Sequence, residues 1–128
     1  MAGVKEYLNR LEEGFLDIRQ LQKYSELPLE CDGLTRVLIY VLNQMRVKHS
    51  VYVGTILYGG KKMTPHFWIK LQDGRIIDYR ARMWLGDQKE IPHGVFSLKK
   101  YPDIVYQGKQ IPMKTDSLTF NVLVGGMV

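Results

Sequence analysis

The chain has little cysteine, no long apolar run and no strong excess of one charge. Its 128 residues include a single cysteine, so no internal disulfide can form and nothing indicates secretion. No segment approaches the ~18 apolar residues of a membrane-spanning helix. The first residues also lack the apolar stretch and the cleavage site of a signal peptide. We therefore expect a cytoplasmic protein with no membrane partner.

The charge pattern argues against nucleic acid as a partner. The formal net charge is +5, and its lysines include two separated pairs, Lys61-Lys62 and Lys99-Lys100, without a basic stripe. This pattern is not typical of a nucleic-acid interface, although a module that binds anions remains a third, weaker hypothesis. Cys31, His66 and His93 lack the spacing of zinc ligands, so we expect no metal and no cofactor.

Apolar residues make up 45% of the chain, enough for one domain over residues 1–128 with a closed core. Two amphipathic helices are predicted in its first part, over residues 3–24 and 31–46. The apolar positions of the first are Val4, Leu8, Leu11, Phe15 and Ile18, widened by Leu16 and Leu21. Those of the second are Leu34, Val37, Leu38, Val41, Leu42 and Met45.

The rest of the chain is predicted to be β-structure. "SVYVGTILY" is β-branched and aromatic and apolar on both faces, which is typical of a central strand. "GGKKMT" is predicted to be a loop, and "HFWIKL" and "RIIDYR" a hairpin around "QDG". Further strands are expected over residues 93–128, in "FSLKKYPDIVYQG" and "SLTFNVLV". The fold class is therefore α+β, with N-terminal helices followed by an antiparallel sheet.

Cys31 stands at the predicted start of the second helix, where chemistry favours a reactive thiol. A thiol attacks as thiolate, and a helix N-terminus or a neighbouring imidazolium favours that form. The free N–H groups of the helix start could also stabilise an oxyanion. A histidine that takes the thiol proton, held by a carboxylate, would complete a catalytic group.

The hairpin register decides whether His66 and Asp78 can meet. A two-residue turn places them on opposite faces of the sheet. A three-residue loop, residues 72–74, places them on one face as diagonal neighbours about 7 Å apart at the backbone. Gly74 supplies the left-handed residue that such a loop needs. This register also gathers an apolar set on the other face, so we prefer it: Phe67, Ile69, Leu71, Ile77 and Tyr79.

The order of these features resembles the transglutaminase-like superfamily of papain-like cysteine enzymes. The matching stretches are "CDGLTRVLIYVLNQMRVKHSVYVG", "HFWIKL" and "DGRIIDYRARMW", within a core of residues 31–84. The resemblance implies Cys31 as nucleophile, His66 as base and Asp78 as the orienting acid. It further implies acyl transfer through a thioester, as in leader-peptide proteases, cell-wall amidopeptidases and arylamine acetyltransferases. The expected partner is a peptide or protein substrate.

Residues around this group have open roles. Glu30 and Asp32 flank the cysteine, and their negative charge opposes thiolate formation. Gln22 is the best polar candidate for an oxyanion hole; otherwise the backbone N–H of Cys31 must serve. Arg80 either binds substrate or, with Arg75 and Arg82, forms a solvated face, which is the commoner role of such a run.

The two tryptophans also divide between a site and a packing role. Trp68 should lie on the His66 face, where it either walls a substrate pocket or covers the sheet. Trp84 either roofs the site or fills the core, and the core is the preferred role.

Two classes of function follow. One is a cysteine hydrolase or acyltransferase of peptidase or amidase type. The alternative is a non-enzymatic interaction or inhibitor protein on the same fold, with Cys31 as a small buried hydrophobe and His66 as a strand histidine.

Overall fold

The computed structural model describes residues 14–125, which form an α+β domain. Four α-helices and one 3-10 turn accompany an antiparallel sheet of five strands in the order β4-β3-β2-β1-β5. The helices are α2 (Ile18–Ser25), α3 (Cys31–Gln44), α4 (Ala81–Leu85) and α5 (Ser117–Leu123), and the 3-10 turn η1 is Leu98–Lys100. The strands are β1 (His49–Tyr58), β2 (Lys61–Leu71), β3 (Ile76–Asp78), β4 (Gly94–Phe96) and β5 (Ile104–Ile111).

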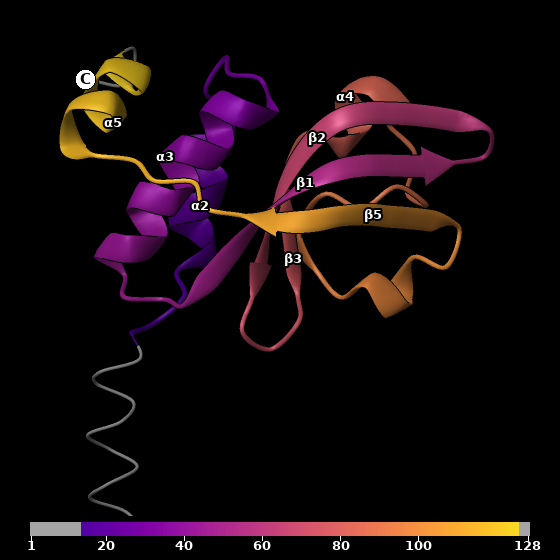
Figure 1. Ribbon diagram of the computed structural model, residues 1–128, viewed down its shortest axis with the longest axis horizontal. Helices are drawn as coiled ribbons and strands as arrows, with labels where there is room; N and C mark the ends of the chain where they lie inside the picture. The colour runs from indigo at the N-terminus through magenta and orange to yellow at the C-terminus, as the bar shows by residue number, and fades with distance from the viewer. Residues whose placement is uncertain (1–13, 126–128) are drawn as a thin grey trace, which may run out of the picture.

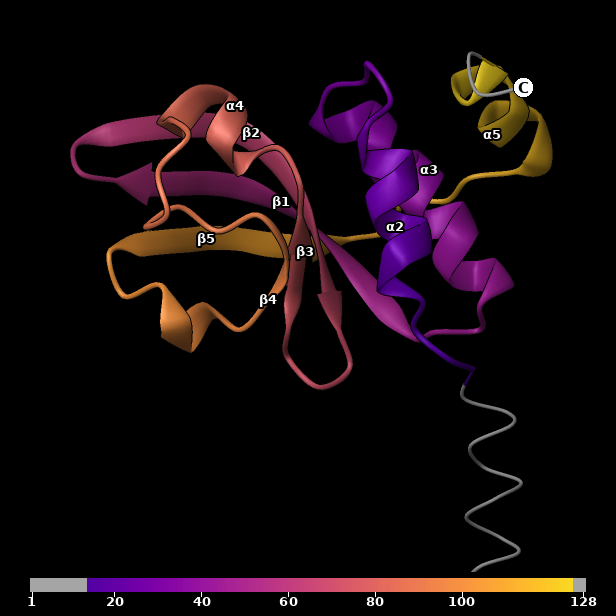
Figure 2. The ribbon, with the colours of Figure 1, turned by 180° about the vertical axis from the view of Figure 1, so that it is seen from behind.

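Helices α2, α3 and α5 gather at one side of the twisted sheet, while α4 lies over its far end (Figures 1 and 2). The main core joins the apolar stripe of α3 to residues of β1, β2 and β3. Leu34, Val37 and Leu42 of that stripe are all buried, as the helical periodicity predicts. Two smaller clusters lie elsewhere, one beneath α4 around Ile56 and Ile91 and one around Trp68.

Both hairpins of the sheet depend on glycines at their turns. Gly59 and Gly60 join β1 to β2, and both have positive φ, which a two-residue turn between twisted strands requires. Residues 61–64, predicted as part of a loop, therefore belong to β2. Between β2 and β3, Ile69 pairs with Ile77 and Lys70 with Ile76, and Gly74 has φ of 94°. This is the register of the three-residue loop, which confirms the sequence-based preference.

The first predicted helix, over residues 3–24, is confirmed at residues 18–24 and wrong at residues 14–17. Its residues 3–13 lie outside the described residues, and residues 14–17 are not helical; α2 begins at Ile18 with Asp17 as its N-cap. Gly14 has φ of 75°, and a Cβ there would lie 1.9 Å from the carbonyl oxygen of Met45. Close backbone packing at Gly14 thus replaces the predicted turn of helix, and Phe15 is left exposed.

The C-terminal segment "SLTFNVLV", predicted as a strand, instead forms α5. Asp116 caps this helix by accepting a hydrogen bond from the backbone N–H of Thr119 at 2.7 Å. Phe120 and Val124, four residues apart, pack against the main core, and Phe120 stacks on Tyr40 of α3. The β-branched and aromatic composition misled the prediction, because the capping residue and the i, i+4 contact with α3 outweigh strand propensity.

Of the helices in residues 14–125, none has both the length and the apolar character needed to cross a membrane.

Candidate functional site

Cys31 is the first residue of α3 and is partly buried. The preceding segment contains Pro28, which disfavours helix at the residue before it, so the helix starts afresh after that turn. Thr35 donates its hydroxyl to the carbonyl oxygen of Cys31 at 2.6 Å, one turn further along. The thiol is thus fixed at the N-terminal end of a well-packed helix, where backbone N–H groups lack helical partners.

His66 and Asp78 meet as the hairpin register predicts. Nε2 of His66 lies 2.7 Å from Oδ2 of Asp78. His66 has no exposed surface and Asp78 retains 4%. Such a buried pair is short and charge-assisted when the ring is protonated.

Asp78 is held by donors from three directions. Besides His66, the backbone N–H of Arg80 donates to Oδ1 at 2.9 Å and the hydroxyl of Tyr106 donates to Oδ2 at 2.8 Å. Burial and the neighbouring Asp78 raise the pKa of Tyr106 far above its usual range, so the phenol stays protonated. The carboxylate therefore has a single orientation, set by donors on β2, on β5 and in the turn that follows β3.

Tyr106 was missed by the sequence-based reasoning. It lies on β5, opposite Ile56 of β1, and β5 is separated from β3 by two strands. Its strand was predicted, but no local pattern links a tyrosine at this position to an aspartate 28 residues earlier. Only the order of the strands in the sheet brings the two together.

The charge of the imidazole follows from its surroundings. Burial lowers the pKa of His66, but the hydrogen bond that the ring donates to Asp78, the interaction with Cys31 and the charge of Asp78 outweigh it and raise the pKa to about 9. Nε2 is occupied by Asp78, whereas buried Nδ1 has no hydrogen-bond partner among residues 14–125. A protonated ring with one free nitrogen thus lies next to the only thiol of the chain.

Arg80 is buried and does not form the predicted solvated face. It is 9% exposed, and its guanidinium donates to the carbonyl oxygens of Ser25, Leu27, Leu29 and Tyr79 at 2.7–3.0 Å. Ser25 is the last residue of α2, and Leu27 and Leu29 belong to the segment between α2 and α3. Arg80 therefore ties the chain that leads into Cys31 to the strand end that carries Asp78, and it is no part of a solvated face.

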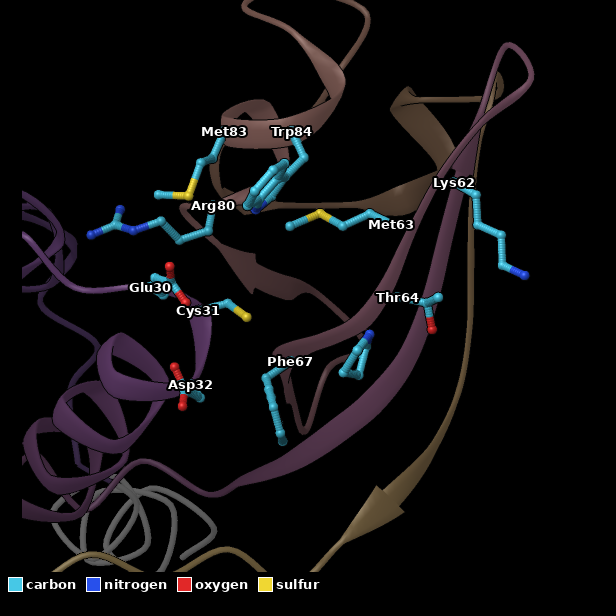
Figure 3. Close-up of a pocket in the computed structure, with 11 residues that line it drawn as sticks. Glu30, Cys31, Asp32, Lys62, Met63, Thr64, Phe67, Arg80, Met83 and Trp84 are labelled. Atoms are coloured by element: carbon cyan, nitrogen blue, oxygen red, sulfur yellow. The ribbon is translucent and has the colours of Figure 1, made fainter.

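A cavity of about 430 Å³ opens at Cys31. Figure 3 shows the sulfur pointing into it, with Glu30 and Asp32 on the side of α3, Met83 and Trp84 above, and Met63 and Thr64 opposite. Helix α4 creates the upper wall because Ala81 and Leu85, one turn apart, are buried beneath it. Of the three residues between them, Met83 and Trp84 are exposed.

Three predicted site residues therefore change their roles. Trp84 is 67% exposed and lines the cavity, so the preferred core placement is wrong. Trp68 lies on the His66 face as expected, but it is buried and absent from the cavity wall. Its ring packs so closely on Gly108 that a Cβ there would lie 2.6 Å from it. Gln22 is exposed on α2 and does not line the cavity either.

No set of three or more His, Cys, Asp or Glu side chains within residues 14–125 is arranged to hold a metal ion. The groups that can carry the chemistry of the site are the thiol of Cys31, the imidazole of His66 and the side chains that line the cavity. No family model, no curated protein and no solved structure matches the chain.

Proposed function

We propose that the protein is a cysteine-dependent acyl-transfer enzyme, a hydrolase or acyltransferase of peptidase or amidase type, related to the transglutaminase-like superfamily. The observation that carries the proposal is the 2.7 Å contact of His66 Nε2 with Asp78, which leaves Nδ1 free beside Cys31. This is the arrangement of nucleophile, base and orienting acid that thiol catalysis uses.

In the first step of the proposed reaction, Sγ of Cys31 attacks the carbonyl carbon of an amide. The C–N bond breaks, a thioester forms, and the protonated His66 gives its proton to the leaving amine. In the second step neutral His66 takes a proton from water or from an acceptor amine. Attack on the thioester then releases an acid or a new amide and restores the Cys31 thiolate beside the protonated His66.

Asp78 and the start of α3 have supporting roles in this scheme. Asp78, held by Tyr106 and the backbone of Arg80, keeps the ring in one orientation and stabilises its charge. The exposed position of Gln22 leaves the backbone N–H groups at the start of α3 as the oxyanion donors.

A non-enzymatic binding protein is the second candidate, and one observation favours it. Glu30 and Asp32 are exposed on either side of Cys31, and their negative charge works against a thiolate. If these carboxylates prevent formation of the Cys31 thiolate, the cavity binds a partner without reacting with it.

The rate of Cys31 alkylation by iodoacetamide between pH 4 and 9 separates the two candidates. The chain has one cysteine, so the increase in intact mass reports this thiol alone. An ordinary thiol titrates near 8.5 and reacts slowly below pH 7. For the enzyme we expect fast labelling that persists well below pH 7 in the wild type and disappears in His66→Ala.

His49→Ala is the matched control, because it removes a histidine that bonds only the carbonyl oxygen of Val47 and should label as the wild type does. Slow labelling that rises only above pH 8 and is equal in the wild type and His66→Ala would contradict the proposal.

A further inference from the structure

The walls of the cavity at Cys31 differ in chemistry on its different sides. Apolar side chains line the cavity on two sides. Trp84 and Met83 come from α4, and Met63 and Phe67 come from β2. The side beside α3 carries two carboxylates, Glu30 and Asp32, and the thiol lies between these regions (Figure 3).

The part of the apolar wall that α4 forms is exposed. Trp84 is 67% exposed and Met83 51%, and both stand on a short helix whose inner residues are already packed. Adjacent apolar side chains at the mouth of a cavity are typical of a surface that a ligand covers. Trp84 in addition offers an aromatic face, which attracts cations as well as apolar groups.

The acidic side has no ion-pair partner among residues 14–125. Neither Glu30 nor Asp32 forms an ion pair within the part of the chain that the structure describes. The two cations that line the same cavity do not reach them. The guanidinium of Arg80 is occupied by backbone carbonyls, and Lys62 extends away from Cys31 (Figure 3).

Cys31, which lines the cavity, also interacts with the buried imidazole of His66. His66 has no exposed surface, its Nδ1 makes no hydrogen bond to the residues described, and it interacts with Cys31. The acidic and apolar walls therefore surround the thiol of Cys31, and the buried imidazole with which it interacts lies outside the cavity wall. A substrate that is complementary to this cavity combines an apolar side chain with a positive charge.

We propose that the Cys31 cavity selects peptides in which a lysine or arginine adjoins an apolar or aromatic residue, with the cation opposite Glu30 and Asp32 and the apolar group against Trp84 and Met83. The inference rests on the proposed function, since it names the substrate class of the same thiol. A basic substrate also resolves the conflict around Cys31, because its charge neutralises the two carboxylates when it binds.

Four dipeptidyl chloromethyl ketones test the inference: acetyl-Phe-Lys, acetyl-Lys-Phe, acetyl-Phe-Glu and acetyl-Glu-Phe. In each reaction the thiolate displaces chloride and forms a thioether, whose rate is read from the intact mass at pH 7. Each pair of residues is tested in both sequence orders, so the test does not assume which of the two peptide positions holds the cation. In at least one order, we expect the lysine compound to react about tenfold faster than its glutamate counterpart.

The double variant Glu30→Gln/Asp32→Asn should bring that ratio close to one. Its matched control is Glu90→Gln/Asp103→Asn, which removes two exposed carboxylates outside the cavity and should keep the wild-type ratio. Trp84→Ala should slow all four compounds several-fold without changing the ratio, because it removes apolar contact and no charge.

The outcomes distinguish the two proposals. Fast, His66-dependent labelling by iodoacetamide with no preference for lysine, or with a preference that Glu30→Gln/Asp32→Asn leaves unchanged, would overturn the inference alone. Slow labelling by iodoacetamide that does not depend on His66 would overturn the proposed function and the inference together.

Discussion

The centre and the mouth of the Cys31 site are built in opposite ways. His66 and Asp78 are buried and joined to Tyr106 and Arg80 by hydrogen bonds of 2.7–2.9 Å. At the mouth of the cavity, by contrast, Trp84 and Met83 are exposed. The carboxylates of Glu30 and Asp32 have no ion-pair partner among residues 14–125. The fold thus fixes the orientation of His66 and Asp78 by internal hydrogen bonds, whereas the mouth presents apolar surface and unpaired carboxylates to the solvent.

Removal of Asp78 should have the largest effect on this contrast. Asp78→Ala leaves a buried imidazole and the hydroxyl of Tyr106 without their acceptor. We expect the free energy of unfolding to fall by roughly 3–5 kcal/mol, as for other broken buried pairs, measured by urea denaturation. Asp73→Ala is the control, since Asp73 bonds only its exposed neighbour Arg75, and its effect should stay below about 1 kcal/mol. Equal losses in the free energy of unfolding of the two variants would show that the buried pair stabilises the fold no more than the exposed one.

The second prediction concerns pH. The pKa of His66 is about 9 in the folded protein and near 6.5 in the unfolded chain, so the folded state binds this proton more tightly. The resulting stabilisation, roughly 3 kcal/mol, is complete below pH 6.5 and is lost as the pH rises through 9.

Urea denaturation of the wild type and of His66→Gln at several values between pH 6 and 10 measures this loss. The difference between the two proteins should shrink as the pH rises, while His49→Gln should follow the wild type. A difference that is independent of pH would contradict a protonated His66.

Tyr106→Phe should have a smaller effect that still reaches the thiol. One hydrogen bond to a buried carboxylate is lost, so we expect about 1–2 kcal/mol of destabilisation. Asp78 then orients the ring less firmly, and labelling of Cys31 by iodoacetamide at pH 6 should slow several-fold. The matched change Tyr58→Phe removes a hydroxyl that bonds the exposed Gln88 and should alter neither quantity. A normal labelling rate in Tyr106→Phe would mean that Tyr106 only stabilises the fold.

The smallest change in stability is expected at the mouth. Trp84→Ala removes a side chain that is 67% exposed, so the free energy of unfolding should change by no more than about 0.5 kcal/mol. Leu85→Ala, at the next position of α4 but buried, should cost about 2–5 kcal/mol. If Trp84→Ala destabilises as strongly as Leu85→Ala, the tryptophan belongs to the core and the contrast between centre and mouth fails.

The sequence by itself determined the parts of the site that depend on local periodicity. The apolar stripe of α3 places Cys31 at a helix start, because residues three and four apart share a helix face. The alternation of Phe67, Ile69 and Ile77, with Gly74 in the loop, selects the register that brings His66 to Asp78. A one-residue slip would turn every side chain of the strand to the other face.

Tertiary structure alone decided the partners of that pair and the shape of the cavity. Tyr106 reaches Asp78 because β5 joins the sheet next to β1. Arg80 reaches the carbonyl oxygens of Ser25, Leu27 and Leu29 because the chain before α3 lies beside the end of β3. Trp84 is exposed because Ala81 and Leu85 take the inner side of α4, and "SLTFNVLV" is helical because α3 offers Tyr40 to Phe120. These outcomes depend on contacts between residues far apart in the chain, whose energy no local pattern contains.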